Sequence, residues 1–398
     1  MGCGKTTLIE NCIQTLKLRN KIFYFSGDDT VFRTNILTDS KYLYELIRGQ
    51  TQEQVLIYID EVQKCEEIFD SLKFIFDKGK AHFIVSGSNP EFLQTVAKKR
   101  LQRRADFKIL SPLSLPEVLF KNKPELLKNI NIFNSFLSGN EVQELPQIEL
   151  TPKMKVIIQD YLKLGGFPLS YLAVDERNSL LEIQKAFDRG FEPIRSDLEK
   201  ISDVTVVELA HLHSNEFTYS EIFNKTRIKQ RNTINEVIHL LNAHGYLGVV
   251  SPMLMDEGKK SYLKKYFFTD PGLVTYLTGT KDILNNKGFL IEGLVYSRLQ
   301  YKLQFELTKN KNLYYFKNYI LKSDGAVRFL NGEVDAVYQV GSQLIPIEVK
   351  STENWNQINI NPLLSFMKNN NCSLGIVLYG GGTVLKKEKI LFWPYWMI

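Results

Sequence analysis

The 398-residue chain contains little cysteine, and the cysteines that it has are scattered. Cys3, Cys12, Cys65 and Cys372 show no C-x-x-C spacing. Zinc sites and disulfide frameworks need such pairs or clusters, so the pattern argues against both. Isolated thiols of this kind are typical of a reducing compartment, and we therefore expect a cytoplasmic protein with reduced cysteines.

Long apolar runs are also absent. No run approaches the roughly 20 residues that a membrane-spanning helix requires, and the start lacks the charged-then-apolar pattern of a secretion signal. We expect no membrane partner. A hydrophobic content of 44% is ample for a buried core, and the length corresponds to roughly two to three domains.

An excess of charge of either sign is missing as well. The formal net charge of +6 is mild, so it permits nucleic-acid contact without arguing for it. Histidines are few and show no ligand spacing. We interpret His211, His213, His239 and His244 as surface or core residues rather than metal ligands.

The chain opens with MGCGKTT, the second half of the phosphate-binding pattern G-x-x-x-x-G-K-[ST]. In that loop backbone N–H groups wrap the β-phosphate, Lys5 reaches the β/γ-phosphates and the Thr6 hydroxyl lies on Mg²⁺. A helix over Thr6 to Leu18 would direct its N-terminal dipole at the anion. The predicted nucleotide-binding residues of the loop are Gly2, Cys3, Gly4, Lys5, Thr6 and Thr7.

The loop is incomplete at its beginning. Counting back from Gly4, the first glycine of the pattern falls before residue 1, and so does the strand that should precede it. A start codon placed too late, a shortened chain or a fold that has lost an edge would each explain this. Because the first loop N–H groups are absent, we expect weaker nucleotide binding by the chain as it stands.

Residues 55–61 read VLIYIDE, an apolar run that ends in two carboxylates. Such a run predicts a strand buried on both faces of a parallel sheet. Carboxylates are costly to bury unless a cation or a reaction needs them. Asp60 would hold Mg²⁺ through water while Glu61 polarises the attacking water, which is the Walker B arrangement. The alternative is a strand-end turn before a helix at Glu66 to Phe76.

Two more apolar runs support this ATPase core. Ile22 to Phe25 lies between the loop and Walker B, as in the additional-strand class of ATPases. His82 to Val85 ends in small polar residues, and Ser88 or Asn89 could sense the γ-phosphate from the strand beside Walker B. We therefore expect ATP as ligand and substrate, with Mg²⁺ as cofactor.

A basic cluster follows the third strand. It is either a solvated face or the source of an arginine finger that acts on a neighbouring subunit's nucleotide, and spacing does not choose between them. The cluster consists of Lys98, Lys99, Arg100, Arg103 and Arg104.

The middle of the chain predicts a connector, helices and a helix-turn-helix. Residues 123–150 have broken periodicity and suggest a variable lid or connector, and 152–200 read as mostly helical with a turn at 165–168. Ser214 to Gly245 predicts a helix-turn-helix, with wing strands at 246–250 and 262–268. The phosphate-binding candidates are Arg227, Lys229, Arg231, Lys259, Lys260, Lys264 and Lys265. The alternative is a packing domain with solvated lysines, so DNA remains a candidate partner.

Residues 333–351 read EVDAVYQVGSQLIPIEVKS, two strands joined by a Gly-Ser turn. Glu348 and Lys350 share one face of the second strand, and Asp335 lies on the first. This is the PD-(D/E)xK arrangement: Asp335 and Glu348 would bind Mg²⁺, and Lys350 would orient the attacking water. The alternative is a cross-strand salt bridge on a solvated face.

Several motifs together resemble a group of prokaryotic AAA-like ATPases, whose C-terminal domain is of the domain-of-unknown-function type. They are DEV at 60–62, SGS at 86–88, Arg104 ahead of LSPLSLPE at 110–117, YLKLGGFP at 161–168, FFTDPG at 267–272 and GEVD…IEVK at 332–350.

The resemblance implies an AAA-type core, a winged helix and a C-terminal domain of restriction-endonuclease fold. Arg104 matches the family's arginine before the PLS segment, which favours the finger and hence a homo-oligomer. Glu292 matches the family's upstream helical carboxylate and would complete the second metal site. Val334 before Asp335 departs from the pattern and leaves the metal ligands intact.

We therefore predict an α/β fold that begins with a P-loop AAA-type parallel sheet whose first strand is missing. The predicted domains are an ATPase core at 1–120, a helical lid at 121–200, a winged helix at 201–280 and a nuclease-fold domain at 281–398. The predicted function is ATP hydrolysis coupled to a candidate Mg²⁺-dependent DNA endonuclease. The alternative is a nucleotide-switched DNA- or protein-binding module with an inactive nuclease fold.

Overall fold

The structure is a computed structural model of the 398-residue chain. It describes all residues except 1, 16–21, 49–54, 80, 122, 141, 143, 198–202, 227, 229, 254–262, 280–282, 307–309 and 322–326. The chain divides into two compact units, residues 1–110 and, leaving aside 243–245, residues 111–398.

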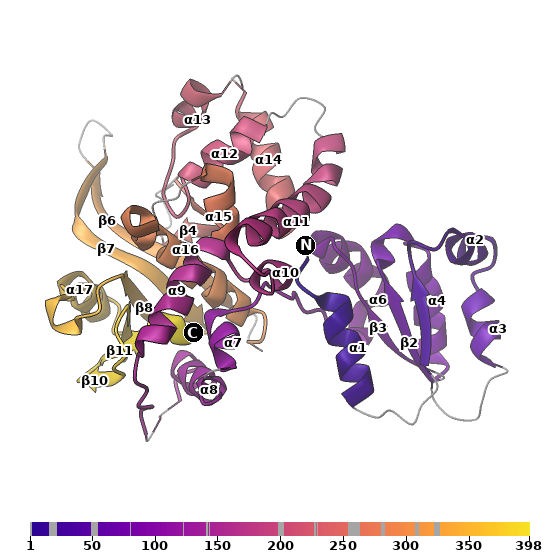
Figure 1. Cartoon of the computed structure of the whole chain (residues 1–398), viewed down its shortest axis with the longest axis horizontal. Helices are drawn as coiled ribbons and strands as arrows, with labels where there is room; N and C mark the ends of the chain where they lie inside the picture. Colours follow the sequence, from indigo (N-terminus) through magenta and orange to yellow (C-terminus); the bar gives the residue numbers. More distant parts are fainter. Residues whose placement is uncertain are drawn as a thin grey trace. The chain divides into compact units, whose positions relative to one another are not determined.

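Helices and strands alternate along the first unit (Figure 1). Its described elements are α1 (Lys5–Thr15), β1 (Ile22–Ser26), α2 (Thr30–Thr38), α3 (Tyr42–Arg48), β2 (Val55–Asp60), α4 (Ile68–Asp77), β3 (Ala81–Val85), α5 (Pro90–Phe92) and α6 (Lys98–Leu101). Strands β1, β2 and β3 pair in parallel in that order. The parallel α/β sheet expected from the sequence is confirmed.

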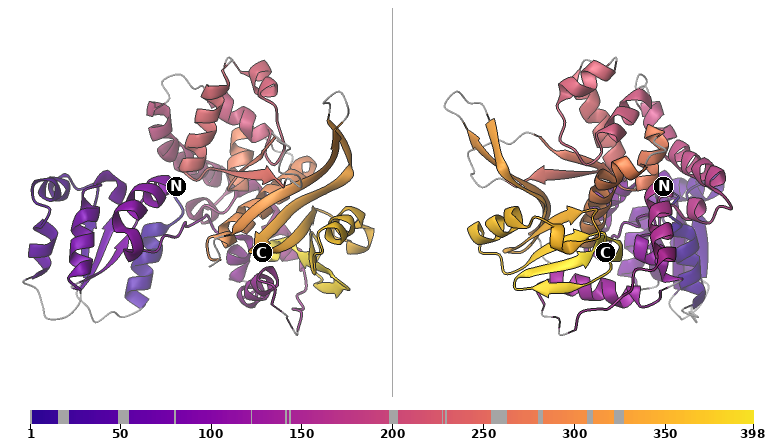
Figure 2. Two further views of the ribbon diagram at one scale, coloured as in Figure 1. Left: turned by 180° about the vertical axis from the view of Figure 1, so that it is seen from behind. Right: turned by 60° about the vertical axis from the view of Figure 1, so that its left-hand side comes forward.

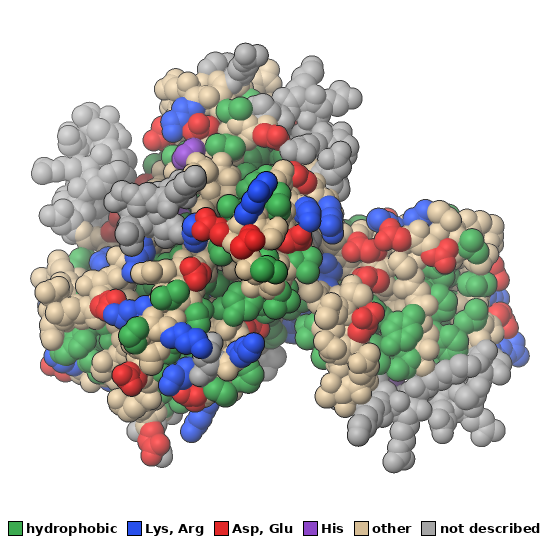
Figure 3. Space-filling model, viewed as in Figure 1, with side chains coloured by type: hydrophobic (Ala, Val, Ile, Leu, Met, Phe, Trp, Pro, Cys, Tyr) green, Lys and Arg blue, Asp and Glu red, His purple; other side chains and the backbone are tan. Residues whose placement is uncertain are grey.

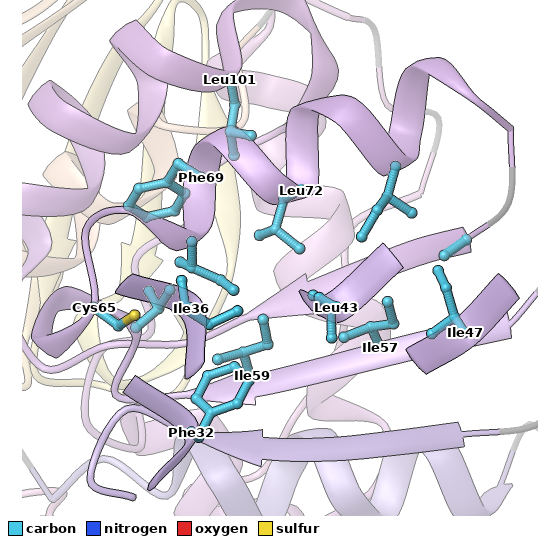
Figure 4. Close-up of a cluster of buried hydrophobic side chains, with 14 of the residues drawn as sticks. Phe32, Ile36, Leu43, Ile47, Ile57, Ile59, Cys65, Phe69, Leu72 and Leu101 are labelled. Carbon is cyan, nitrogen blue, oxygen red and sulfur yellow. The ribbon is translucent and has the colours of Figure 1, made fainter. Parts of the chain in front are cut away.

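The core of the first unit forms because β2 is apolar on both faces. Leu56 and Tyr58 point to the side where Ile13 of α1 packs. Ile57 and Ile59 point to the other side, toward α2, α3 and α4, where Figure 4 shows their side chains meeting those of the helices. Each fully buried aliphatic side chain of this kind contributes about 1.5–3 kcal/mol.

The parallel register brings the carboxyl ends of the strands to one edge. Ser26 pairs with Asp60, and Ile59 pairs with Val85. The chain then turns sharply, because Glu61 adopts a positive φ of 48°. Glycine is required at Gly27, where a Cβ would lie 2.1 Å from the carbonyl oxygen of Glu61. The polar residues that follow each strand are therefore packed close together at this edge of the sheet.

The second unit combines helices with a mixed sheet. Among its described residues the helices are α7 (Leu115–Phe120), α8 (Leu126–Leu137), α9 (Pro152–Leu164), α10 (Pro168–Tyr171), α11 (Glu176–Asp197), α12 (Asp203–His211), α13 (Tyr219–Lys225), α14 (Arg231–Ala243), α15 (Pro271–Thr278), α16 (Ile283–Leu303) and α17 (Asn361–Asn369). In the part of the chain that the structure describes, no helix combines the length and apolarity needed to cross a membrane.

The strands of the second unit run in the order β10-β11-β9-β8-β7-β6-β4-β5. They are β4 (Leu247–Pro252), β5 (Lys265–Phe268), β6 (Lys311–Leu321), β7 (Val327–Val340), β8 (Gln343–Lys350), β9 (Gly375–Tyr379), β10 (Leu385–Lys387) and β11 (Ile390–Pro394). The hairpin predicted at 333–351 is confirmed, since β7 and β8 pair antiparallel with Ala336 opposite Ile347. Figure 2 shows the long β6 and β7 strands side by side.

The segment 123–150, predicted to be a variable lid or connector with broken periodicity, contains helix α8. Its Leu126, Phe133 and Phe136 are buried at helical spacing, and the Phe133 ring lies 5.2 Å from that of Trp393. Asn129 occupies a buried position in the same stripe, which broke the apolar pattern in the sequence.

The segment predicted to be a helix-turn-helix contains α13, α14 and the strand pair β4–β5. The two strands are antiparallel, with Leu247 opposite Phe268. Strand β4 also pairs in parallel with β6 through Ser251 and Tyr314, so the hairpin is continuous with the larger sheet. Of the phosphate-binding candidates, Arg227, Lys229, Lys259 and Lys260 lie outside the described residues.

Three distant segments meet at the buried carboxylate of Asp270. Asp270 caps α15 by accepting the Gly272 N–H at 2.9 Å, and its other oxygen accepts the Gly166 N–H at 2.7 Å. Gly166 in turn accepts the N–H of Leu113 at 2.8 Å through its carbonyl oxygen. Burial raises the pKa of Asp270 to about 6, although the backbone donors oppose the rise.

This junction explains the glycines of the segment 161–168. A Cβ at Gly165 would lie 1.9 Å from Asp270 Oδ1, and one at Gly166 would lie 2.0 Å from the carbonyl oxygen of Leu113. Gly165 also has a φ of +70°, which disfavours other residues. Glycine therefore allows the carboxylate and two backbone segments to come together.

We predict that Gly165→Ala destabilises the fold far more than Gly279→Ala. Gly279 is the control for positive φ in open space, since its φ is +63° and nothing lies within 4 Å of the added Cβ, whereas the ψ of −168° at Gly165 adds a backbone cost of its own. Gly279→Ala should cost about 1 kcal/mol for backbone conformation alone. Gly165→Ala must also displace the Asp270 carboxylate and should cost about 3 kcal/mol or more. Denaturant unfolding measures both, and equal losses would contradict the role of this junction.

Candidate functional site

The start of α1 and the end of β2 meet in the first unit. Helix α1 begins at Lys5 directly after Gly4, whose φ is +79°. The Thr6 hydroxyl donates a hydrogen bond to Asp60 Oδ2 at 2.9 Å, across 54 residues of sequence. The geometry thus brings together the P-loop threonine and the first Walker B carboxylate.

Asp60 is held by further donors on its other oxygen. Oδ1 accepts hydrogen bonds from the Ser86 hydroxyl and, at 3.0 Å, from the N–H of Glu61. Ser86 lies 3.2 Å from the buried Tyr58 hydroxyl, whose pKa is raised by burial. Sequence reasoning gave no role to Ser86, although its place directly after the third strand was the available signal.

Glu61 is bound by polar side chains from the same edge. Its Oε2 accepts hydrogen bonds from Ser88 Oγ at 2.9 Å and from Gln63 Nε2. Gln63 also donates to Ser88 at 2.8 Å, so the three side chains form one network. Of the two sensor candidates, Ser88 thus reaches Glu61. The Asn89 side chain caps α5 by accepting the Phe92 N–H at 3.0 Å.

The donor set at this edge fits a magnesium nucleotide. Mg²⁺ prefers hard oxygen ligands and is usually bound by one or two protein oxygens together with nucleotide phosphates. Thr6 and Asp60 offer a hydroxyl and a carboxylate at the N-terminus of α1, where N–H groups and the helix dipole favour an anion.

A second polar cluster lies on the sheet of the second unit. The register of β7 and β8 places Asp335 beside Glu348 and Lys350. Lys350 Nζ lies 2.5 Å from Glu348 Oε1 and 3.5 Å from Asp335 Oδ2. The N–H of Val349 donates to Asp335 Oδ2 at 2.7 Å. The three predicted residues are therefore brought together.

Both carboxylates of this cluster are short of positive charge. Burial raises the pKa of Asp335, although Lys350 and the Val349 N–H oppose it. Burial and the neighbouring Asp335 raise the pKa of Glu348 to about 7. Glu348 is only 6% exposed, and its Oε2 is buried without a hydrogen-bond partner. An unpaired buried carboxylate oxygen fits a site that takes a cation.

The structure corrects the interpretation of Lys265 as a phosphate-binding residue. Lys265 is 5% exposed, and its ammonium lies 2.9 Å from both Glu292 Oε1 and Glu333 Oε1. Burial alone would lower its pKa, but the two glutamates outweigh burial and raise it. A buried ammonium in two ion pairs cannot face a phosphate backbone.

Glu292 thus binds Lys265 and also lies near Asp335, to whose carbonyl oxygen it is linked through Tyr296. The Tyr296 hydroxyl lies 2.6 Å from Glu292 Oε1 and 2.7 Å from the carbonyl oxygen of Asp335, so its single hydrogen can be donated to either acceptor. The role of Glu333 was missed in the sequence, although its position two residues before Asp335 put it on the same face. Within the described ranges, no three Asp, Glu, His or Cys side chains gather in metal-binding geometry.

Comparison with protein families identifies three segments. Residues 2–119 match the family model for an AAA domain. The N-terminal part of the chain is therefore similar to AAA domains. Residues 156–283 and 287–398 match two domains of unknown function, DUF8612 and DUF4143, respectively. No curated protein gave a significant match.

Solved structures show only distant likenesses. The Aeropyrum pernix ORC1 protein in complex with DNA has 10% identity and a TM-score of 0.27, over 72% of this chain and 86% of that one. Protein VC1899 from Vibrio cholerae has 12% identity and a TM-score of 0.18, over 90% and 88%. Can2 from Sulfobacillus thermosulfidooxidans, in complex with cyclic tetra-adenylate, has 13% identity and the same TM-score, over 95% and 96%. Likenesses at these scores do not establish a shared fold.

Within the AAA domain, Arg104 forms a bidentate ion pair. Its Nε and Nη2 atoms donate to the two carboxylate oxygens of Asp77, at 2.7 and 3.0 Å. The hydrogen bonds from Arg104 lower the pKa of Asp77. Arg100 binds Asp70 of the same helix, α4, and Glu66, which lies just before that helix, at 2.8 Å each. The basic cluster thus follows an acidic face of α4, and an arginine finger at Arg104 would have to leave Asp77.

We predict that Arg104→Ala and Asp77→Ala separate the finger from the ion pair. If Arg104 acts between subunits, Arg104→Ala should lower ATP turnover by about 10³-fold, whereas Asp77→Ala should retain it. Mixing Arg104→Ala protein with Lys5→Ala protein should then restore some turnover. Phosphate release measures the rates. If the two substitutions change ATP turnover equally, Arg104 acts only through its ion pair with Asp77, and the arginine-finger hypothesis is refuted.

Proposed function

We propose that the AAA domain binds Mg-ATP at the N-terminus of α1 and hydrolyses it to ADP and phosphate. The observation that carries the proposal is the hydrogen bond between Thr6 and Asp60, because it joins the P-loop to Walker B. The match of residues 2–119 to an AAA domain supports the same proposal.

Each side chain at this edge has a role in the proposal. Lys5 binds the phosphates, and Thr6 and Asp60 hold the metal that neutralises phosphate charge. Glu61 orients the attacking water. Its hydrogen bonds to Ser88 and Gln63 compete with that water for the same oxygen, Oε2. The attacking water would therefore bind the other oxygen, Oε1, or displace one of these donors from Oε2.

We predict that Lys5→Ala lowers ATP affinity by at least tenfold, about 1.4 kcal/mol, because the phosphates lose their cation. Glu61→Gln should retain ATP binding and block turnover. Lys78→Ala, at the exposed end of α4, is the matched control and should change neither. Equilibrium binding of a fluorescent ATP analogue and phosphate release provide the two readouts. Equal ATP affinity for the parent chain and Lys5→Ala would refute the phosphate-binding role.

A second proposed activity concerns the cluster of Asp335, Glu348 and Lys350. We propose that it binds one divalent cation and cleaves a DNA phosphodiester. The buried Oε2 of Glu348, which has no hydrogen-bond partner, supports this activity, because a bound cation would pair with it. A bound metal would supply Lewis acidity, and Lys350 would orient the attacking water.

The competing proposal is a binding module controlled by nucleotide. The mild net charge favours it. So do the side chains of the face shown in Figure 3, where basic and acidic residues are interspersed. Under this alternative no variant cleaves DNA, and binding of DNA or protein differs between the ATP and ADP states.

We predict that Asp335→Ala weakens Mn²⁺ binding by more than the ~10–100-fold that loss of an outer-shell partner costs. Glu348→Gln should also weaken Mn²⁺ binding, whereas Lys350→Ala should retain the metal and lose the cleavage rate. Glu353→Gln, an exposed carboxylate near the end of the same strand, is the control.

The full chain is the appropriate material for this titration, because residues 281–398 lie within a unit that begins at Ser111. Isothermal titration with Mn²⁺ gives affinity and stoichiometry. Mn²⁺-dependent nicking of DNA, compared between the parent chain and Asp335→Ala, gives activity. If Asp335→Ala binds Mn²⁺ with the same affinity as the parent chain, the nuclease proposal is refuted.

A further inference from the structure

Lys265 places a fixed positive charge inside the second cluster. It begins β5, yet its ammonium lies between a glutamate of α16 and a glutamate of β7, at 2.9 Å from each. The rings of Tyr315 and Tyr296 lie 5.1 and 5.9 Å from the same nitrogen. Two carboxylates and two aromatic rings thus surround the Lys265 ammonium. These contacts offset the cost of burying its charge, so the lysine stays protonated inside the fold.

The charges of the cluster leave room for one more cation. Among the side chains that the structure describes, the four carboxylates of Glu292, Glu333, Asp335 and Glu348 are paired with two ammonium groups, those of Lys265 and Lys350. One divalent ion would neutralise the remaining two negative charges. The unpaired Oε2 of Glu348 indicates that the uncompensated negative charge lies beside Asp335, away from Glu292, which is paired with Lys265.

We propose that Lys265 is a resident cation that occupies the place of a second divalent ion. The inference rests on the proposed metal-dependent activity of Asp335 and Glu348 and deepens it. Glu292 is then a positioning residue that binds Lys265 and accepts the Tyr296 hydroxyl, and it is not a metal ligand. The site takes a single divalent ion, held by Asp335 and Glu348.

The geometry makes the exchange of a lysine for a metal chemically reasonable. Glu292 Oε1 and Glu333 Oε1 already converge on one point, since both bind the same nitrogen. Carboxylate oxygens that converge on a point suit Mn²⁺ when the ammonium is removed. Tyr296 joins Glu292 to the backbone of Asp335, so the two cation positions belong to one network.

The test counts Mn²⁺ ions bound by the full chain without nucleotide, by the loss of the free Mn²⁺ signal in electron paramagnetic resonance. Lys265→Met should bind one Mn²⁺ more than the parent chain. Lys264→Met, which removes an exposed charge from the adjacent residue, should bind the same number as the parent. The double variant Lys265→Met with Glu292→Gln should lose the additional ion.

An equal count in the parent chain and Lys265→Met would overturn the proposal. The parent count and its response to Asp335→Ala test the metal site of the proposed function, whereas the difference between the parent and Lys265→Met tests Lys265. The two failures are therefore distinguishable.

Folding is followed by circular dichroism, because removing Lys265 leaves two buried carboxylates without their cation. A Lys265→Met chain whose unfolding temperature rises with Mn²⁺ by more than that of the parent chain and that of the double variant, both of which keep Asp335 and Glu348, would support the proposal. A Lys265→Met chain that stays unfolded with Mn²⁺ would overturn it, because the metal would then not replace the lysine.

Discussion

The carboxylate of Asp270 fixes the framework on which the second cluster is built. Its two oxygens satisfy the N–H groups of Gly166 and Gly272, and so hold the end of α9 against the start of α15. The residue before it, Thr269, accepts the Ser297 hydroxyl of α16 at 2.9 Å through its carbonyl oxygen. Glu292 and Tyr296 lie on that same helix. The position of the acidic cluster thus depends on a buried charge that takes no part in its chemistry.

The two candidate sites solve the problem of buried polar groups differently. In the AAA domain the ends of parallel strands converge, and hydroxyls of Thr6, Ser86 and Ser88 bind the carboxylates of Asp60 and Glu61. Hydroxyls can rotate away when a ligand arrives. In the second unit ammonium groups bind the carboxylates, and they keep their charge whatever is bound. The first arrangement suits a site that changes state, and the second suits one that remains preorganised.

The features that the sequence could predict are those with local causes. The apolar run before Asp60 and Glu61 indicates a buried strand wherever it occurs, and the alternation around Asp335 and Glu348 fixes their common face. Lys265 was misread because its burial depends on Glu292 and Glu333, which lie 27 and 68 residues away. The pairing of Gly166 with Asp270 spans 104 residues, and nothing near Gly166 identifies its partner. The bounds of helix α8 could not be predicted, because Asn129 interrupts its apolar stripe.

Strand β4 belongs to two structures at once. It pairs with β5 in the hairpin that follows α14, and it pairs with β6 in the sheet that carries Asp335 and Glu348. A helix-turn-helix joined by a free linker could tilt without mechanical consequence for such a cluster. Here the strand that follows α14 is held on both sides, and its partner β5 carries the ammonium of Lys265. A movement of this hairpin would therefore also move one of the charges of the cluster.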